Sequence, residues 1–251
     1  MMRYLYLMLV AFLSTNVFAV IKDYPFYVDS QGKLCLGTTF LPKAGVDAAG
    51  LPCSDGKFAV GVRFIDAPED KSSPSGIYLE RPFLIVDGIN LDPVEKRTLT
   101  DLHNDVLQIG LPQILKNLGY TPVLVQFSET VRTSLQDNSN SLSQLFSFLN
   151  NNLHIPFPGA KDDGFIVMGI SQGGVIGRYG SYLYDTHRND TDAPIRLFSS
   201  LDSPHQGAVM PFGLLSTVSY WSLVGGSSAA EMFKDILVAE GAADLLYYDH
   251  K

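Results

Sequence analysis

A serine between two glycines is the feature of this sequence best suited to nucleophilic chemistry. Residues 169–173, Gly-Ile-Ser-Gln-Gly, match the pattern G-x-S-x-G, with Ser171 at its centre. The pattern follows an apolar run at 165–168 and precedes apolar residues at helical spacing from Val175 to Leu183. In a strand–turn–helix of this kind the glycines allow a tight turn, and the serine hydroxyl is raised above the sheet. Ser171 is therefore the candidate nucleophile for acyl transfer; the alternative is a glycine-rich connection that grips a phosphate.

Two backbone N–H groups are candidates for an oxyanion hole beside this serine. The N–H of Gln172 would lie at the positive end of the following helix. The second donor is expected in the loop after the apolar run at 83–86, and we assign it to Ile89, with Asn90 as its neighbour. The alternative is that Asp87 and Gly88, which begin this loop, form only a turn.

A serine nucleophile needs a base and an acid, and in folds with this turn both follow the serine in the chain. Of the three later histidines, His187 is expected to lie in a polar loop and to be solvated. His250 is the candidate base, although no strand is expected before it to support the imidazole. Asp202, at the end of a fourth apolar run, is the candidate acid; alternatively, it caps the loop that follows.

Three segments resemble known hydrolases. The segment Ser203-Pro-His-Gln-Gly207 after a G-x-S-x-G turn resembles the bacterial lipase branch of the α/β-hydrolase fold, and the S-Q-G-G turn is similar to that of palmitoyl-thioesterase-like hydrolases. More closely, residues 82–90, 171–179 and 202–208 resemble a group of secreted, lipase-like bacterial hydrolases. The likeness covers about residues 81–250.

The resemblance implies ester hydrolysis in which Ser171 attacks a carbonyl, a histidine is the base and a carboxylate orients that histidine. It also implies that His205, in the P-H-x-G segment, supports the loop and is not the base.

The elements that must position these residues alternate along the chain. Short apolar runs typical of strands buried on both faces occupy residues 83–86, 123–127, 165–168 and 195–198. Helices are predicted between them, around residues 112–118 (ending at Gly119), 142–149 and 175–183. This order predicts an α/β fold with a mostly parallel sheet flanked by helices.

The last segment of the chain differs from the part before it. Residues 210–250 are apolar without β-branched runs, which predicts two or three helices that form either a lid over an acyl pocket or part of the core. The final strands of a hydrolase sheet are not recognisable in it, so we expect residues 81–251 to form a hydrolase domain that lacks them.

The amino end has the pattern of an export signal. Arg3, an apolar run of ten residues and the small-residue ending at Ala19 predict a secretory signal peptide over residues 1–19. The alternative is an uncleaved membrane anchor, but a spanning helix needs about 20 apolar residues. Residues 20–80 are expected to be an extension of a few strands that a disulfide between Cys35 and Cys53 stabilises, which suits a secreted or periplasmic protein.

Composition excludes several classes of partner. With 18 basic and 26 acidic residues among 251, the chain has a net charge of −8, the wrong sign for a nucleic-acid binder. Two thiols without a nearby histidine make a poor zinc site, and nothing indicates a metal or nucleotide cofactor. The expected function is a secreted serine hydrolase of small-molecule or lipid esters, with transient contact to a lipid surface. The alternatives are a thioesterase or amidase with the same nucleophile, or an inactive hydrolase-like binding module.

Overall fold

The structure is a computed structural model. The residues that it describes are 21–36, 57–65, 79, 81–89, 97–128, 130, 133–152 and 164–249. The predicted signal peptide, Cys53, Asn90 and His250 lie outside these residues.

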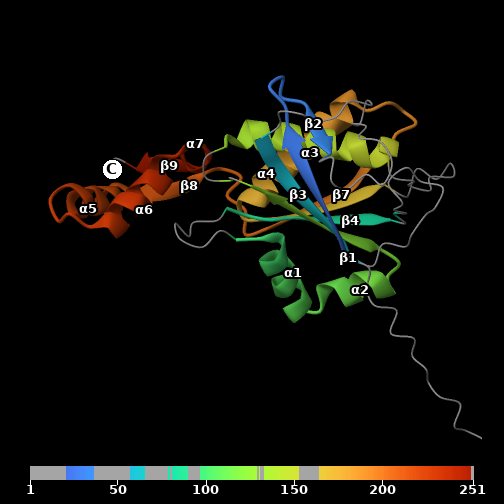
Figure 1. Ribbon diagram of the computed structural model, residues 1–251, viewed down its shortest axis with the longest axis horizontal. Coiled ribbons are helices and arrows are strands. Elements are labelled where there is room, and N and C mark those ends of the chain that lie inside the picture. Colours follow the sequence, from blue (N-terminus) through green and yellow to red (C-terminus); the bar gives the residue numbers. More distant parts are fainter. Residues whose placement is uncertain are drawn as a thin grey trace, which may run out of the picture.

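A mixed sheet of seven strands forms the centre of the molecule (Figure 1). The strands lie in the spatial order β2-β1-β3-β5-β4-β6-β7. Their bounds are β1 Ile21–Val28, β2 Leu34–Leu36, β3 Lys57–Ile65, β4 Pro82–Val86, β5 Thr121–Phe127, β6 Phe165–Ile170 and β7 Ile195–Leu201. β5, β4, β6 and β7 are parallel, whereas β3 is antiparallel to both β1 and β5. The carboxyl ends of the four parallel strands therefore meet at one edge of the sheet, where ligands bind in folds of this class.

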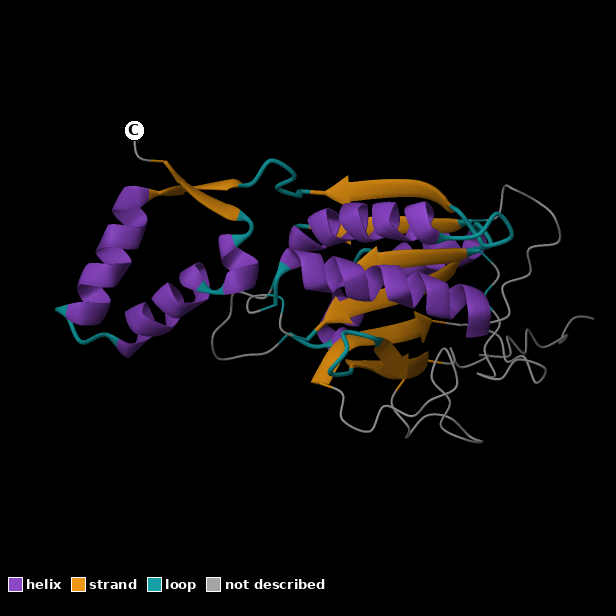
Figure 2. Cartoon of the chain, turned by 90° about the horizontal axis from the view of Figure 1, so that it is seen from above, coloured by secondary structure: helices purple, strands orange, loops and turns teal. Residues whose placement is uncertain are grey.

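Helices cover both faces of the sheet (Figure 1), and Figure 2 looks onto the face that carries the two longest of them. Their bounds are α1 Leu99–Gln108, α2 Leu111–Asn117, α3 Leu135–Asn152 and α4 Gln172–His187. Side chains of α3 and α4 pack on one face against Leu84, Val86 and Val125, and side chains of α1 and α2 pack on the other against Ile85 and Leu124. Successive residues of a strand point to opposite faces, so the apolar runs of β4 and β5 are buried on both sides. The expectation that residues 195–198 are also buried on both faces is wrong, because β7 is the outer strand of the sheet and none of its residues is buried. The predicted fold class is confirmed.

The helix α1 is an element that the sequence reading did not predict. Its N-terminus carries a capping box, in which Asp101 N–H donates to the Thr98 hydroxyl at 3.4 Å and Thr98 N–H donates to the Asp101 carboxylate at 2.7 Å. Leu102 and Val106 are buried against the sheet. The capping box and this burial therefore fix α1 against the sheet.

The strands predicted for the amino-terminal extension belong to the same sheet as the rest. β3 hydrogen-bonds to β5, and β1 hydrogen-bonds to β3. Phe26 of β1 is fully buried, and its ring meets that of Phe148 of α3 edge to face with centroids 4.9 Å apart. The division of the chain between residues 80 and 81 stays a prediction, although strands from its two sides pair with each other.

Residues after β7 form an arm that projects away from the main sheet (Figure 1). The arm contains β8 Ala208–Pro211, α5 Phe212–Leu223, α6 Ser228–Val238, α7 Glu240–Ala243 and β9 Leu246–Asp249. β8 and β9 pair in parallel with each other and not with the seven-stranded sheet. The expected helices are present, and no described residue after β7 extends the main sheet. The expectation that no strand precedes His250 is wrong, because β9 ends at Asp249 and is formed by pairing with β8. Within the described part of the chain, no helix is long and apolar enough to cross a membrane.

Candidate active site

Ser171 occupies a strained turn between β6 and α4. Its backbone angles are φ 52° and ψ −126°, a conformation that residues other than glycine rarely adopt. The turn is held by its own backbone, because Ser171 N–H donates to Leu201 O of β7 at 2.9 Å and Gly174 N–H donates to Ser171 O at 3.0 Å. The serine therefore lies where a strand, a helix start and the end of the neighbouring strand meet.

Glycines make this crowded turn possible. A Cβ added to Gly169 would overlap Gly174, and one added to Gly173 would overlap the carbonyl oxygens of Val86 and Asp87. These neighbours are backbone atoms, which cannot move aside as a flexible side chain can. A Cβ on Gly174 would overlap Ser203, which comes from the loop after β7. The glycines of the G-x-S-x-G pattern thus reflect close approach of the turn to the start of α4 and the end of β4, and Gly174 allows the approach to the loop after β7.

The loop after β4 lies directly beside the serine, as an oxyanion loop must. A Cβ on Gly88 would stand 3.0 Å from both Ile170 O and Ser171 Cβ. Ile89 follows Gly88 in this loop, whereas its neighbour Asn90 lies outside the described residues. Gln172 begins α4, so its N–H is one of the helix's free amino-terminal donors. Both predicted oxyanion donors therefore belong to segments that border Ser171.

Asp87 is an anchor of this loop that the sequence analysis missed. Its buried carboxylate accepts hydrogen bonds from Arg97 Nε at 2.8 Å and from Gln126 Nε2 at 3.0 Å. Arg97 Nη2 also donates to Asp105 of α1 at 2.7 Å. Burial lowers the pKa of Arg97, but the hydrogen bonds to Asp87 and Asp105 and their negative charges outweigh it, so the net pKa is raised. Arg97 therefore stays cationic and ties the loop after β4 to α1.

Asp202 directly follows Leu201, whose carbonyl oxygen accepts a hydrogen bond from Ser171 N–H. It has a left-handed φ of 48°, which aspartate tolerates better than most residues, and it is exposed. His205, three residues later, is engaged elsewhere: its Nε2 lies 2.8 Å from Ser200 Oγ and its ring meets that of Phe198. Among the described residues, no histidine side chain hydrogen-bonds to Ser171. The roles predicted for Asp202 and His250 stay predictions.

His187 lies at the far end of the same helix that begins at Ser171. A helix of the 16 residues of α4 is about 24 Å long, which separates the two side chains too far for contact. The sequence reading placed His187 in a polar loop, but it is the last residue of α4 and its Nδ1 lies 2.7 Å from Leu183 O. As expected, its side chain is exposed.

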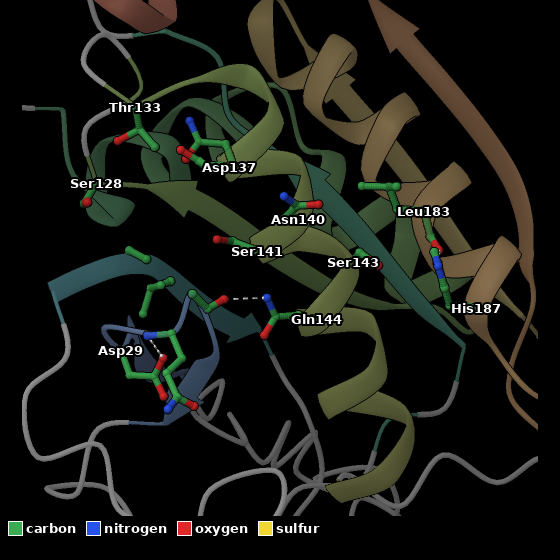
Figure 3. A pocket seen from close by; sticks show the side chains of 15 residues that line it. Asp29, Ser128, Thr133, Asp137, Asn140, Ser141, Ser143, Gln144, Leu183 and His187 are labelled. Carbon is green, nitrogen blue, oxygen red and sulfur yellow. Dashed lines mark hydrogen bonds between the residues drawn. The ribbon is translucent and has the colours of Figure 1, made fainter.

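His187 also lines a polar groove of about 630 Å³ (Figure 3). Polar side chains of α3, including Asp137, Asn140 and Gln144, form one wall of it, and Gln144 donates to Gly32 O at 2.9 Å. The groove lies between α3 and the turn that joins β1 to β2, away from the serine turn.

The two long helices of the arm, α5 and α6, are not core helices. In α5 no side chain with a described environment is buried, and in α6 only Leu237 is buried. Large apolar side chains at the distal end of α5 are exposed, namely Tyr220, Trp221, Leu223 and Val224. The sequence left open whether this segment forms a lid over an acyl pocket or part of the core. The exposure of α5 and α6 does not fit a place in the core.

Two further expectations concern residues that the structure does not describe. The predicted disulfide depends on Cys53, which lies outside the described residues, as does the predicted signal peptide. Among the residues that are described, no group of three His, Cys, Asp or Glu side chains could hold a metal ion.

The mostly parallel sheet, the helices on both of its faces and the strained serine turn after β6 are together the α/β-hydrolase arrangement that the sequence predicts. No family model matches the chain, and no curated protein matches it.

Solved structures of ester hydrolases resemble the chain only coarsely. Lipase A of Candida antarctica in its closed state is 13% identical with a TM-score of 0.38, over 74% of this chain and 38% of that one. Acetyl xylan esterase 1 from a Thermoanaerobacterium species is 13% identical with a TM-score of 0.32, over 91% of this chain and 64% of that one. Phosphonate-inhibited esterase B from Lactobacillus rhamnosis is 9% identical with a TM-score of 0.32, over 86% of this chain and 55% of that one. The chain thus spans less than two thirds of each of these proteins.

Proposed function

We propose that this protein is a serine hydrolase that cleaves carboxylic esters through an acyl-serine intermediate. The observation that carries the proposal is the strained Ser171 turn at the N-terminus of α4, packed so closely against the ends of β4 and β7 that only glycines fit around it. A strained backbone persists only where its surroundings hold it, and such positions cluster at active sites.

The arrangement suits acyl transfer. Ser171 Oγ attacks the ester carbonyl carbon while its proton passes to a base, and the oxyanion accepts hydrogen bonds from the N–H groups of Gln172 and Ile89. When the intermediate collapses, the carbon–oxygen bond to the alcohol breaks and the base returns the proton to that alcohol. Water then repeats the sequence on the acyl-serine and releases the carboxylic acid.

In this proposal His250 is the base and Asp202 is the acid that orients it. Asp202 directly follows Leu201, whose carbonyl binds Ser171 N–H, so its position at the site edge suits the acid. His205 serves the loop instead, since its imidazole is engaged by Ser200 and Phe198. We expect His250→Ala to lower kcat at least 100-fold and His205→Ala to change kcat less than tenfold, measured on a p-nitrophenyl ester. A larger loss of kcat in His205→Ala than in His250→Ala would assign the base to His205.

Labelling with a fluorophosphonate tests the nucleophile. The purified wild-type protein should form a covalent adduct, and peptide mass spectrometry should locate the adduct on Ser171. Ser171→Ala should abolish both labelling and hydrolysis of p-nitrophenyl esters, while Ser199→Ala, at an exposed serine of β7, should retain both. A folded wild-type protein that is neither labelled nor active would instead be a hydrolase-like binding module.

A substrate panel separates the ester hydrolase from its rivals. Matched acetyl to decanoyl esters, thioesters and anilides should be compared by kcat/KM. The proposal expects the esters to be preferred and longer acyl chains to be accepted. A thioester preference would assign the alternative activity to the same nucleophile.

We further propose that the distal end of α5 contacts lipid surfaces. Residues 208–230 contain no charged side chain, and Leu223 and Val224 are 75% and 68% exposed. Neighbouring Tyr220 and Trp221 have rings suited to the boundary between water and lipid. Because the whole chain carries −8, a lipid surface without net charge is the favoured partner.

Trp221 is the only tryptophan, so its fluorescence reports on this contact alone. Phosphatidylcholine vesicles should shift its emission to the blue, and Leu223→Asp should abolish the shift. Ile114→Asp, at an exposed apolar position of α2, is the matched control and should keep it. An unchanged wild-type spectrum at saturating lipid would contradict the contact.

We also propose that the chain is exported and cleaved after Ala19. Expression of the full reading frame in a bacterial host should give a periplasmic or secreted product that begins at Val20.

A further inference from the structure

The side chain of Gln172 makes contacts that its role as a backbone donor does not require. It is fully buried, and its Nε2 donates to Thr130 O at 3.2 Å and to Gly241 O at 3.0 Å. Thr130 lies in the loop between β5 and α3, and Gly241 lies in α7. An amide nitrogen carries two hydrogens, and both are used here.

These contacts demand a side chain that donates twice. Oε1 of Gln172 is buried and makes no hydrogen bond, so all polar contacts of the side chain are made by Nε2. Glutamate would place an oxygen against two carbonyl oxygens, and methionine would offer no donor. The position is therefore specific for an amide of this length.

The helix α7 is the root of the arm and is held at two points. Besides the bond from Gln172, Asp244 Oδ2 accepts a hydrogen bond from Leu135 N–H at 2.9 Å. Leu135 begins α3, whose first N–H groups lack partners within the helix. Gly241 and Ala242 are buried, and Figure 1 shows α7 where the arm joins the main body. The serine turn, the loop at Thr130 and the arm therefore share one junction.

We propose that the Gln172 side chain is a positioning group for acyl transfer, which makes the geometry of the serine turn depend on the docking of α7. The inference rests on the proposed ester hydrolase function. The first turn of α4 has no preceding helical turn to fix it, so contacts from neighbouring segments determine where its N–H groups point. An oxyanion donor must be placed accurately, because a displacement of about 1 Å can lower the rate on the order of 100-fold.

The variant Gln172→Met tests this role, because methionine fills similar space without donating. We expect kcat on a p-nitrophenyl ester, and the rate constant of fluorophosphonate labelling, to fall about tenfold or more, with a smaller change in KM. Amide hydrogen exchange of residues 242–245 should become faster at the same time, because α7 loses its bond to the turn.

Tyr184→Phe is the matched control for lost stability. Tyr184 is also buried, and its hydroxyl donates to Ala193 O at 2.9 Å near the C-terminal end of α4, three helical turns from the serine turn. This variant should lower the midpoint of thermal unfolding while keeping the labelling rate within twofold of wild type. A comparable fall in both variants would show that general stability, and not positioning, limits the reaction.

The remaining outcomes also decide the inference. Wild-type labelling rates in a folded Gln172→Met would overturn it. If that variant does not fold, Gln172→Glu keeps the length and shape, and a normal labelling rate in it would overturn the inference equally. A wild-type protein without labelling or hydrolysis would overturn the proposed function, whereas exchange at residues 242–245 would still report whether Gln172 docks α7.

Discussion

Gly173 is the residue on which the serine turn depends most directly. Its missing side chain lets the first turn of α4 lie against the carbonyl oxygens of Val86 and Asp87. We expect Gly173→Ala to destabilise the protein by about 1–3 kcal/mol, since the added methyl must displace backbone atoms. Fluorophosphonate labelling of Ser171 should be lost even where the variant folds. Urea unfolding and labelling measure the two effects.

Gly213 provides the control for this substitution. It lies in α5, where a Cβ would meet nothing within 4 Å. Gly213→Ala should leave labelling unchanged and stabilise the helix by about 0.5–1 kcal/mol. A Gly173→Ala variant that behaved like Gly213→Ala would show that the turn has room which the structure does not indicate.

The residues of the serine turn could be predicted from sequence because their roles are local. Gly169, Ser171 and Gly173 lie within five positions, and the apolar runs around them set the strand and the helix. The role of Arg97 could not be predicted in this way. Arg97 binds the carboxylate of Asp87, ten positions earlier, and that carboxylate is buried only once the sheet has folded. The Gln172 side chain contacts residues 42 positions before it and 69 positions after it, and no local sequence pattern predicts such contacts.

At the scale of elements, α1 supports the site through Arg97. The guanidinium stands just before the helix and binds the buried carboxylate of Asp87. Arg97→Met should destabilise the protein by about 1–3 kcal/mol, because Asp87 keeps only the hydrogen bond from Gln126. Labelling of Ser171 should slow severalfold as the oxyanion loop loosens. Asp105→Asn removes only the exposed side of the network and should cost less than about 0.5 kcal/mol.

The capping box of α1 gives a pH dependence with a defined sign. Hydrogen bonds from the Thr98 hydroxyl and from Thr98 N–H lower the pKa of Asp101. The stabilisation is therefore complete above the usual carboxyl pKa and is lost as pH falls through the lowered one. Wild type should lose more unfolding free energy than Asp101→Asn between about pH 5 and pH 2. Parallel urea titrations at each pH check this, and equal losses in both proteins would contradict it.

Elements with strong local patterns were predictable, and those that depend on distant pairing were not. The strands β4, β5 and β6 are recognisable by continuous apolar residues, and β7 by the short run around Leu197 and Phe198. β8 and β9 are four residues each, and they form because residues 208–211 pair with residues 246–249. The composition of this apolar segment gives no sign of that pairing. α1 carries apolar residues at 99, 102 and 106, but its short, charged sequence gives a weak signal.

For the whole molecule, the amino-terminal strands contribute to the same core as the site. Phe26 is fully buried among residues of β3 and α3. Phe26→Ala should therefore destabilise the entire sheet by about 3–5 kcal/mol and shift one cooperative transition. Circular dichroism in urea measures it. Ile21→Ala, on the same strand but 45% exposed, should shift that transition much less.

An independent extension would behave differently. In that case Phe26→Ala would melt β1 and β2 in a separate early step, while Ser171 labelling persisted at urea concentrations where these strands had unfolded. The sequence suggested such a separation because residues 20–80 are broken by turn clusters and carry short runs. Their strands become part of the main sheet only through antiparallel pairing with β5, at a sequence distance that periodicity does not reveal.

The outer strand β7 has a consequence for how the protein should be handled. Within the described residues, β7 hydrogen-bonds to β6 on one side only, and Leu197 and Leu201 are more than half exposed. Open edges of this kind recruit strands from other chains. Two copies meeting across a twofold axis could pair their β7 edges antiparallel, so self-association would grow with concentration. Reaction rates and unfolding curves should therefore be measured at low protein concentration and repeated over a tenfold range of that concentration.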